Sequence, residues 1–345
     1  MIEELNEQQQ INYDNFFNNA DNLHLSPSAL KMLRTSPKTY FKHYVLDEKE
    51  LKVAKFFDEG SLVHCMVLEP EELNEKFINM GISVPTDSTR LCLETLLTLE
   101  RSATELEEYS EEILEYLKEV NLHQSLVDDK KADKSGNMLT GDQKRLAKII
   151  TENSKEYFKI MIEGRSKTIV DSATWDKCYN KAKAILNNPD AQNLLIKTNE
   201  DDEIRFELEL SDRPDELQYG VKGILDVIKV DRKNKTIYVS DVKTHGGKLK
   251  DFPEAVNKHM YWLQPPAYFI LAKSLLRGKA FDFKIVFNYI VVDQSDGVYC
   301  FKVSDETMNK WLEDLTKLIN FEISYHINNK DFTLPYEFAN KLISL

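Results

Sequence analysis

Two aspartates and a lysine, Asp226, Asp241 and Lys243, supply the side chains needed to hydrolyse a phosphodiester. A pair of carboxylates with open positions is the usual way to hold Mg²⁺, a hard cation that prefers oxygen ligands and keeps several waters. A lysine cannot bind such a cation, but it can stabilise an anion or position a water that must lose a proton. Together these residue types predict attack of a metal-activated water on a phosphate.

A predicted β-hairpin must position these three side chains. The apolar segments Gly220–Val230 and Ile237–Thr244 are joined by a polar, charged turn, which is typical of two neighbouring strands. Because side chains alternate faces along a strand, Asp241 and Lys243 are expected on one side of the sheet. Val242 then points the other way, toward the core.

Two further motifs flank this hairpin. Upstream, the run from Gly60 to His64 (GSLVH) reads as a helix and is followed by Leu68-Glu-Pro70. Downstream, Gln264 and Tyr268 stand four residues apart, so one helical face can carry both. A lone helical histidine is more often a buried core residue than a ligand, and Tyr268 is as readily explained as core.

Taken in this order, the upstream histidine, the aspartate, the D-x-K strand and the Q-x-x-x-Y helix resemble the PD-(D/E)XK nucleases of the RecB-like branch. The run LSPSAL at Leu25–Leu30 and the run GSLVHCMVLEPE make the chain most similar to RecE-type exonucleases of phages and prophages. Glu207 matches an acidic residue that RecE-type proteins carry before the catalytic strands, although an exposed strand glutamate is an equally good interpretation.

The resemblance implies an α/β fold with a restriction-endonuclease-like core, in which helices flank a central mixed sheet. It covers residues 25–80 and 168–335, which are the expected nuclease domain. Residues 1–24 are expected to form a flexible N-terminal arm, 81–167 a mostly helical insertion, and 336–345 a C-terminal tail. The insertion is either a plain helical addition or an element that clamps DNA, docks a partner or forms an oligomer contact.

The resemblance also implies roles for individual residues. The expected metal ligands, for Mg²⁺ or Mn²⁺, are His64, Asp226, Asp241 and the carbonyl of Val242. The expected catalytic side chains are Asp226, Asp241, Lys243, Gln264 and Tyr268. Because prolines at 265 and 266 would break a helix interior, the Q-x-x-x-Y alignment requires a helix that begins near Tyr261.

The net charge of −13 argues against a general nucleic-acid coat protein, but a local basic lining would suffice for a nuclease. The acidic excess is concentrated outside the motifs, in the segment 105–119. The residues expected to contact DNA are Lys31, Arg34, Lys38, Lys42, Lys248 and Lys250. For the first four, an ordinary solvated helical surface is the competing interpretation.

The four cysteines lie far apart and no C-x-x-C occurs, which argues against zinc and against an iron–sulfur cluster. No apolar run approaches about 20 residues, so neither a membrane span nor a signal peptide is expected. These features favour a protein of the cytoplasm, in a bacterial cell or a phage-infected host.

By resemblance, the expected activity is 5′ to 3′ degradation of double-stranded DNA from an end, which leaves a single strand for an annealing recombinase. Related exonucleases form rings, so a homo-oligomer is implied. One alternative is a structure-selective or restriction-type endonuclease on the same core. Another is a non-catalytic interaction protein that binds through its acidic helix, although the presence of Asp226, Asp241 and Lys243 together counts against it.

Overall fold

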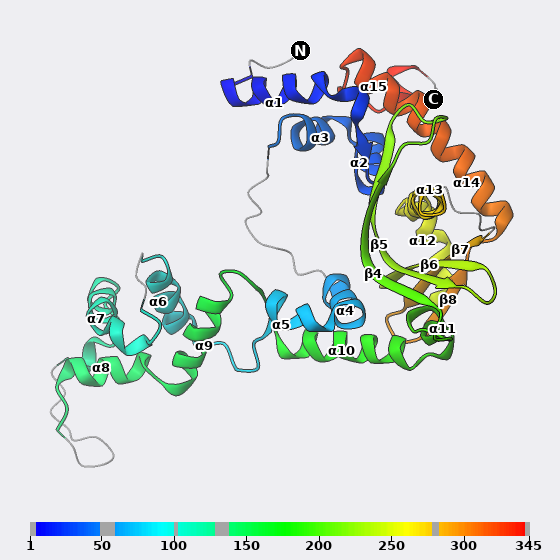
Figure 1. Ribbon diagram of the computed structural model, residues 1–345. Helices are drawn as coiled ribbons and strands as arrows, with labels where there is room; N and C mark the ends of the chain where they lie inside the picture. Colours follow the sequence, from blue (N-terminus) through cyan, green and yellow to red (C-terminus); the bar gives the residue numbers. More distant parts are fainter. Residues whose placement is uncertain (1–4, 49–58, 100–102, 128–137, 278–282, 342–345) are drawn as a thin grey trace. The chain divides into compact units, whose positions relative to one another are not determined.

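The computed structural model describes residues 5–48, 59–99, 103–127, 138–277 and 283–341. The chain divides into two compact units (Figure 1). The first comprises Met1–Ala54, Val63–Glu69 and Asn180–Leu345, and the second comprises Lys55–Leu62 and Pro70–Tyr179.

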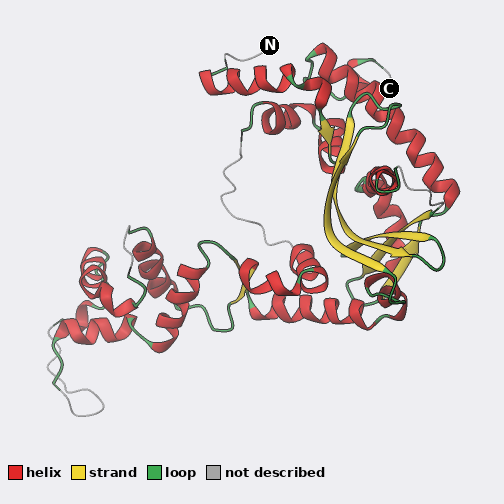
Figure 2. Ribbon diagram, viewed as in Figure 1, coloured by secondary structure: helices red, strands yellow, loops and turns green. Residues whose placement is uncertain are grey.

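A six-stranded mixed sheet forms the centre of the first unit (Figure 2). Its strands are β1 (His24–Leu25), β4 (Glu203–Asp212), β5 (Gly220–Asp231), β6 (Thr236–Thr244), β7 (Lys284–Val292) and β8 (Val298–Lys302). Their order is β1-β5-β6-β7-β8, and β4 pairs with β5. The β1–β5 and β6–β7 pairs are parallel, and the β4–β5, β5–β6 and β7–β8 pairs are antiparallel. The predicted hairpin is therefore β5–β6, displaced by no more than one residue at each end.

Helices flank this sheet, as the expected restriction-endonuclease-like fold requires. They are α1 (Glu7–Asn18), α2 (Pro27–Thr35), α3 (Pro37–Tyr40), α11 (Pro189–Leu195), α12 (Phe252–Lys258), α13 (Gln264–Ser274), α14 (Asp305–Lys317), α15 (Ser324–Asn329) and α16 (Tyr336–Ala339), together with the later parts of α4 (Glu59–Leu68) and α10 (Ser172–Asn187). Helix α13 packs on β5 and on α14, and it buries Ala267, Leu271 and Ala272 in the main core.

The N-terminal segment differs from the flexible arm that its composition predicts. Residues 7–18 form helix α1, and Asn6 caps it in a reciprocal pair of hydrogen bonds with Gln9. Tyr13, Phe16 and Phe17 project from this helix and pack against the core. Aromatic residues at helical spacing therefore anchor a segment whose Asn and Gln content is typical of a loose terminus.

The second unit has its own small core. It contains α5 (Leu73–Lys76), α6 (Asp87–Leu97), α7 (Ser110–Glu119), α8 (Gly141–Ile149), α9 (Glu152–Glu163) and a parallel pair of short strands, β2 (Phe77–Asn79) and β3 (Thr168–Val170). Its buried residues include Leu93, Ile113, Tyr157 and Phe158. The polar loop expected at 128–141 lies mostly outside the described residues. Nowhere in the described part of the chain is a helix both long enough and apolar enough to cross a membrane.

Candidate active site

The register of β4 and β5 brings two acids together. Phe206 pairs with Val227, so the next position places Glu207 opposite Asp226. This pair makes no ladder contact, because the backbone of Glu207 has a φ of +49°, in the left-handed region that a strand residue rarely adopts. Such a conformation costs free energy and is found more often at functional sites than elsewhere.

Strands β5 and β6 separate where Asp226 and Asp241 lie. Their ladder ends at the pair Val227–Ser240, one residue short of the two aspartates. Across the opening, the backbone N–H of Val242 donates a hydrogen bond of 2.8 Å to Asp226 Oδ2. The separation leaves a space between the strands for the two carboxylates. In a continuous ladder, backbone hydrogen bonds would occupy that space.

Asp241 is completely buried and contacts two other residues that the sequence predicts for the site. Its Oδ2 lies 2.5 Å from Lys243 Nζ, so the lysine lies on the same side of the strand, as alternation predicts. Its Oδ1 accepts a hydrogen bond of 2.9 Å from Gln264 Nε2. Lys243 also lies over the ring of Tyr261, with Nζ 5.5 Å from the ring centroid.

Burial and the neighbouring charge of Asp226 raise the pKa of Asp241, and the cation of Lys243 offsets only part of this rise. Burial alone would lower the pKa of Lys243, but the carboxylates of Asp241 and Asp226 raise it overall, so the amine stays protonated. The site therefore has more negative charge than one lysine balances. A buried carboxylate in such surroundings is stabilised by a further cation.

His64 on α4 lies between two of the acids. Its Nε2 is 3.2 Å from Asp226 Oδ2 and 3.3 Å from Glu207 Oε1. Burial lowers the pKa of His64, but the hydrogen bond and charge of Asp226, with the charge of Glu207, raise it overall. The histidine is therefore not an isolated core residue but part of an acidic cluster with Asp226, Asp241 and Glu207, called the acidic cluster below.

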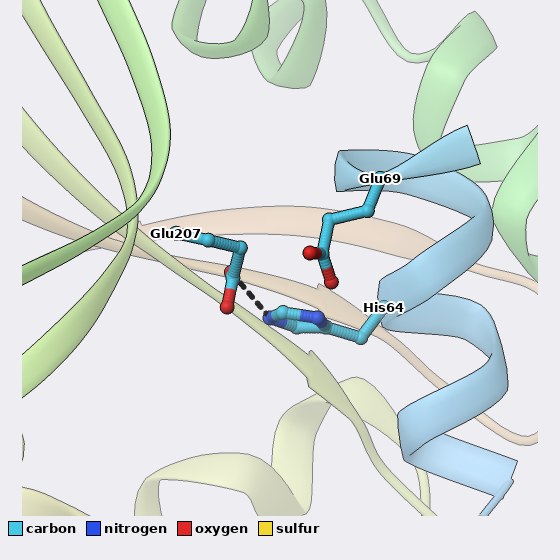
Figure 3. A group of neighbouring side chains, drawn as sticks. All are labelled: His64, Glu69 and Glu207. Atoms are coloured by element: carbon cyan, nitrogen blue, oxygen red, sulfur yellow. Dashed lines mark ion pairs between the residues drawn. The ribbon is translucent and has the colours of Figure 1, made fainter. Parts of the chain in front are cut away.

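Figure 3 shows a third acid, Glu69, which directly follows α4 and points toward the imidazole of His64. Ligand atoms of His64, Glu69 and Glu207 all lie within 4.8 Å of one another, a spacing that can hold a metal ion. In the sequence, Glu69 stands only at the end of the histidine helix, before Pro70, and this position predicts no role for it. Glu69 lies five residues after the histidine and beyond the end of α4, a spacing that does not place two residues on one helical face, so the sequence carries no signal for their approach.

Gln264 and Tyr268 come from α13, whose start resolves the difficulty posed by the two prolines. A short 3₁₀ turn, Tyr261–Leu263, precedes the α-helix, which begins at Gln264 with both prolines in its first turn. The backbone nitrogens of that turn have no intrahelical partner, so proline costs nothing there. Tyr268 is buried, and its ring packs against the backbone of Gly223 on β5.

A model of the PD-(D/E)XK nuclease superfamily matches residues 24–332, which is most of the chain. The chain belongs to this superfamily. Among solved structures, the nuclease is similar to a candidate exonuclease from Eubacterium rectale, with 11% identity, 100% of this chain and 94% of the other covered, and a TM-score of 0.41. No curated protein matches the nuclease.

PD-(D/E)XK nucleases use divalent metals, and the donor set of this nuclease suits one. The carboxylates of Asp226 and Asp241 and the carbonyl of Val242 are hard oxygen donors of the kind that Mg²⁺ prefers. His64, Glu69 and Glu207 add further donors beside Asp226.

The basic residues predicted to contact DNA differ among themselves. Arg34 is held by Glu322 at 3.4 Å and Glu337 at 3.7 Å, which argues against a phosphate contact. Five lysines are exposed and, within the described residues, form no ion pair: Lys31, Lys38, Lys42, Lys248 and Lys250. Lys248 and Lys250 come four and six residues after the end of β6.

Proposed function

We propose that this nuclease degrades double-stranded DNA from an end, 5′ to 3′, with Mg²⁺ or Mn²⁺. The observation that carries the proposal is the convergence of Asp226, Asp241, Lys243 and Gln264 on one opening between β5 and β6, with His64 beside it. The end-dependent activity and its polarity rest on the resemblance of the motifs to those of RecE-type exonucleases.

In this proposal, Asp226, Asp241, the carbonyl of Val242 and His64 hold the cation. When bound, the cation lowers the pKa of a water and polarises the scissile phosphate. The protein contributes preorganisation: Gln264 fixes Oδ1 of Asp241, and the N–H of Val242 fixes Oδ2 of Asp226. Neither carboxylate then has to be ordered when the substrate arrives.

Lys243 supplies the positive charge that the reaction needs. Phosphodiester hydrolysis builds negative charge on the phosphate oxygens, and a protonated amine in a buried site stabilises that charge more strongly than it would in water. The raised pKa of Lys243 keeps its amine charged at neutral pH. Its contact with Tyr261 holds the side chain over the opening.

The proposal extends to a biological role in phage-type recombination. The single strand left by the reaction would serve an annealing recombinase, and a ring-shaped homo-oligomer would enclose the duplex. Both statements follow from the resemblance alone.

One plasmid, presented in linear and in covalently closed form with Mg²⁺, tests the proposal. The wild type should consume only the linear form, and Asp241→Asn should consume neither. On linear DNA labelled at one end, a 5′ label should be released before a 3′ label. Cutting of the closed circle would instead establish an endonuclease, and absence of metal-dependent cleavage would establish a non-catalytic protein.

A further inference from the structure

A second concave site lies in the same unit, outside the acidic cluster. It is a cavity of about 460 Å³ whose lining includes Arg34, Asn257, Met260, Trp262, Glu337 and Phe338. Its walls combine aromatic rings with an amide and charged groups, which is the mixture found where planar polar ligands bind.

The cavity is joined to the active site by a single turn of chain. Trp262 lines it, Tyr261 lies under Lys243, and Gln264 donates to Asp241. In a 3₁₀ turn each residue advances the chain by about 2 Å and rotates it by about 120°, so Trp262 and Gln264 lie about 4 Å apart along its axis but on different sides of the turn. The hydroxyl of Tyr289 donates a hydrogen bond of 2.8 Å to the carbonyl of Tyr261, which fixes this turn on the sheet.

The charges in the cavity select against a phosphate. The guanidinium of Arg34 lies 5.8 Å from the ring centroid of Trp262 and is neutralised by Glu322 and Glu337. With that cation already paired, a second anion would meet the carboxylate of Glu337, which is about half exposed at 45%. An uncharged group avoids this repulsion.

The same walls suit the flat face and polar edge of a nucleobase. Phe338, 52% exposed, and Trp262 offer aromatic surface for stacking. The amide of Asn257 can both donate and accept, and the carboxylate of Glu337 can accept from an exocyclic amino group. A base reaches such a pocket only when it has left its stack, as bases of single strands and frayed ends do.

We propose that this cavity binds one unstacked nucleobase of the DNA strand whose backbone passes the acidic cluster, an inference that rests on the proposed nuclease function. The base belongs to a nucleotide within a few positions of the scissile phosphate, because Trp262 and Gln264 lie on different sides of one turn of chain. The pocket then helps to separate the end of a duplex by capturing a base that has come free.

Trp262 itself provides the first readout. The chain has three tryptophans, so Trp175→Phe with Trp311→Phe leaves Trp262 as the sole indole. This protein is titrated with a short single-stranded oligonucleotide in Ca²⁺, and gels establish that the DNA stays intact. Stacking should quench the Trp262 fluorescence. Binding that leaves this fluorescence unchanged would overturn the proposal.

The second readout is a double-mutant cycle between the protein and the DNA. Trp262→Ala should weaken single-strand binding about tenfold, within the range for loss of one base–aromatic stack. An abasic nucleotide at one position should weaken wild-type binding by a similar factor and should leave binding by Trp262→Ala unchanged. Trp262→Phe should retain most of the affinity, which separates loss of stacking from loss of folding.

Tyr299→Ala removes an exposed aromatic residue, 55% exposed on β8 and outside the cavity, and should not alter the affinity. Equal additive losses at every abasic position would exclude a defined base pocket. If wild type and variants all fail to bind or cleave DNA, the proposed function fails. If the wild type binds and cleaves while Trp262→Ala behaves identically, only the pocket fails.

Discussion

The backbone N–H of Val242 holds the carboxylate of Asp226 across the opening between β5 and β6, with a hydrogen bond of 2.8 Å. Replacement of Asp226 by Asn keeps an oxygen acceptor for that N–H but removes the charge. We expect the fold to be retained and cleavage of linear DNA to fall more than about a hundredfold, since even outer-shell partners of metal sites contribute 10- to 100-fold. Initial rates on end-labelled duplex measure this, and activity within a few-fold of wild type would remove Asp226 from the site.

Gly223 leaves the space that the ring of Tyr268 fills. A methyl group at this position would lie 2.8 Å from Tyr268 Cε1, closer than a buried ring tolerates. Gly223→Ala should therefore destabilise the protein by about 1–3 kcal/mol, the usual cost of overpacking a core. Urea unfolding measures the change. Gly246→Ala is the matched control, because a methyl group there meets no atom within 4 Å.

The hydrogen bond from Gln264 to Asp241 predicts an effect on metal affinity. Gln264→Ala removes the 2.9 Å contact and leaves Oδ1 of a buried carboxylate free to reorient. We expect the Mg²⁺ concentration for half-maximal cleavage to rise about 10- to 100-fold, as for other outer-shell partners. Activity titrated against Mg²⁺ tests this, and a fall in maximal rate without a shift in the midpoint would contradict the positioning role.

The exposed lysines and the paired arginine should respond differently to salt. Each phosphate contact contributes about 0.9 to the slope of log affinity against log salt concentration on duplex DNA. Lys248→Gln should lower that slope by about this amount if the lysine contacts a phosphate. Arg34→Gln should leave it unchanged, because Glu322 and Glu337 already neutralise the guanidinium. Binding isotherms at several salt concentrations decide both cases.

The sequence predicts the elements closest to the chemistry well, because short-range patterns determine them. The strands that carry Asp226 and Asp241 are found within one residue, and the two prolines predict a helix start near Tyr261, where a 3₁₀ turn leads into α13 at Gln264. Glu69 had no such signal, because its role depends on an approach to Glu207 on β4, far away in the chain. The ion pairs of Arg34 could not be predicted from the sequence for the same reason, because both of its partners lie near the C-terminus.

The parallel pairing of β1 with β5 bears on the order in which the protein can fold. His24 pairs with Gly220, so β1 finds its partner only after the whole segment 25–219 has been synthesised. Closing so long a loop has a substantial entropic cost that local contacts cannot offset in advance. The N-terminal segment therefore cannot complete its docking on the sheet until β5 has been synthesised, and this docking is expected to be a late step in folding.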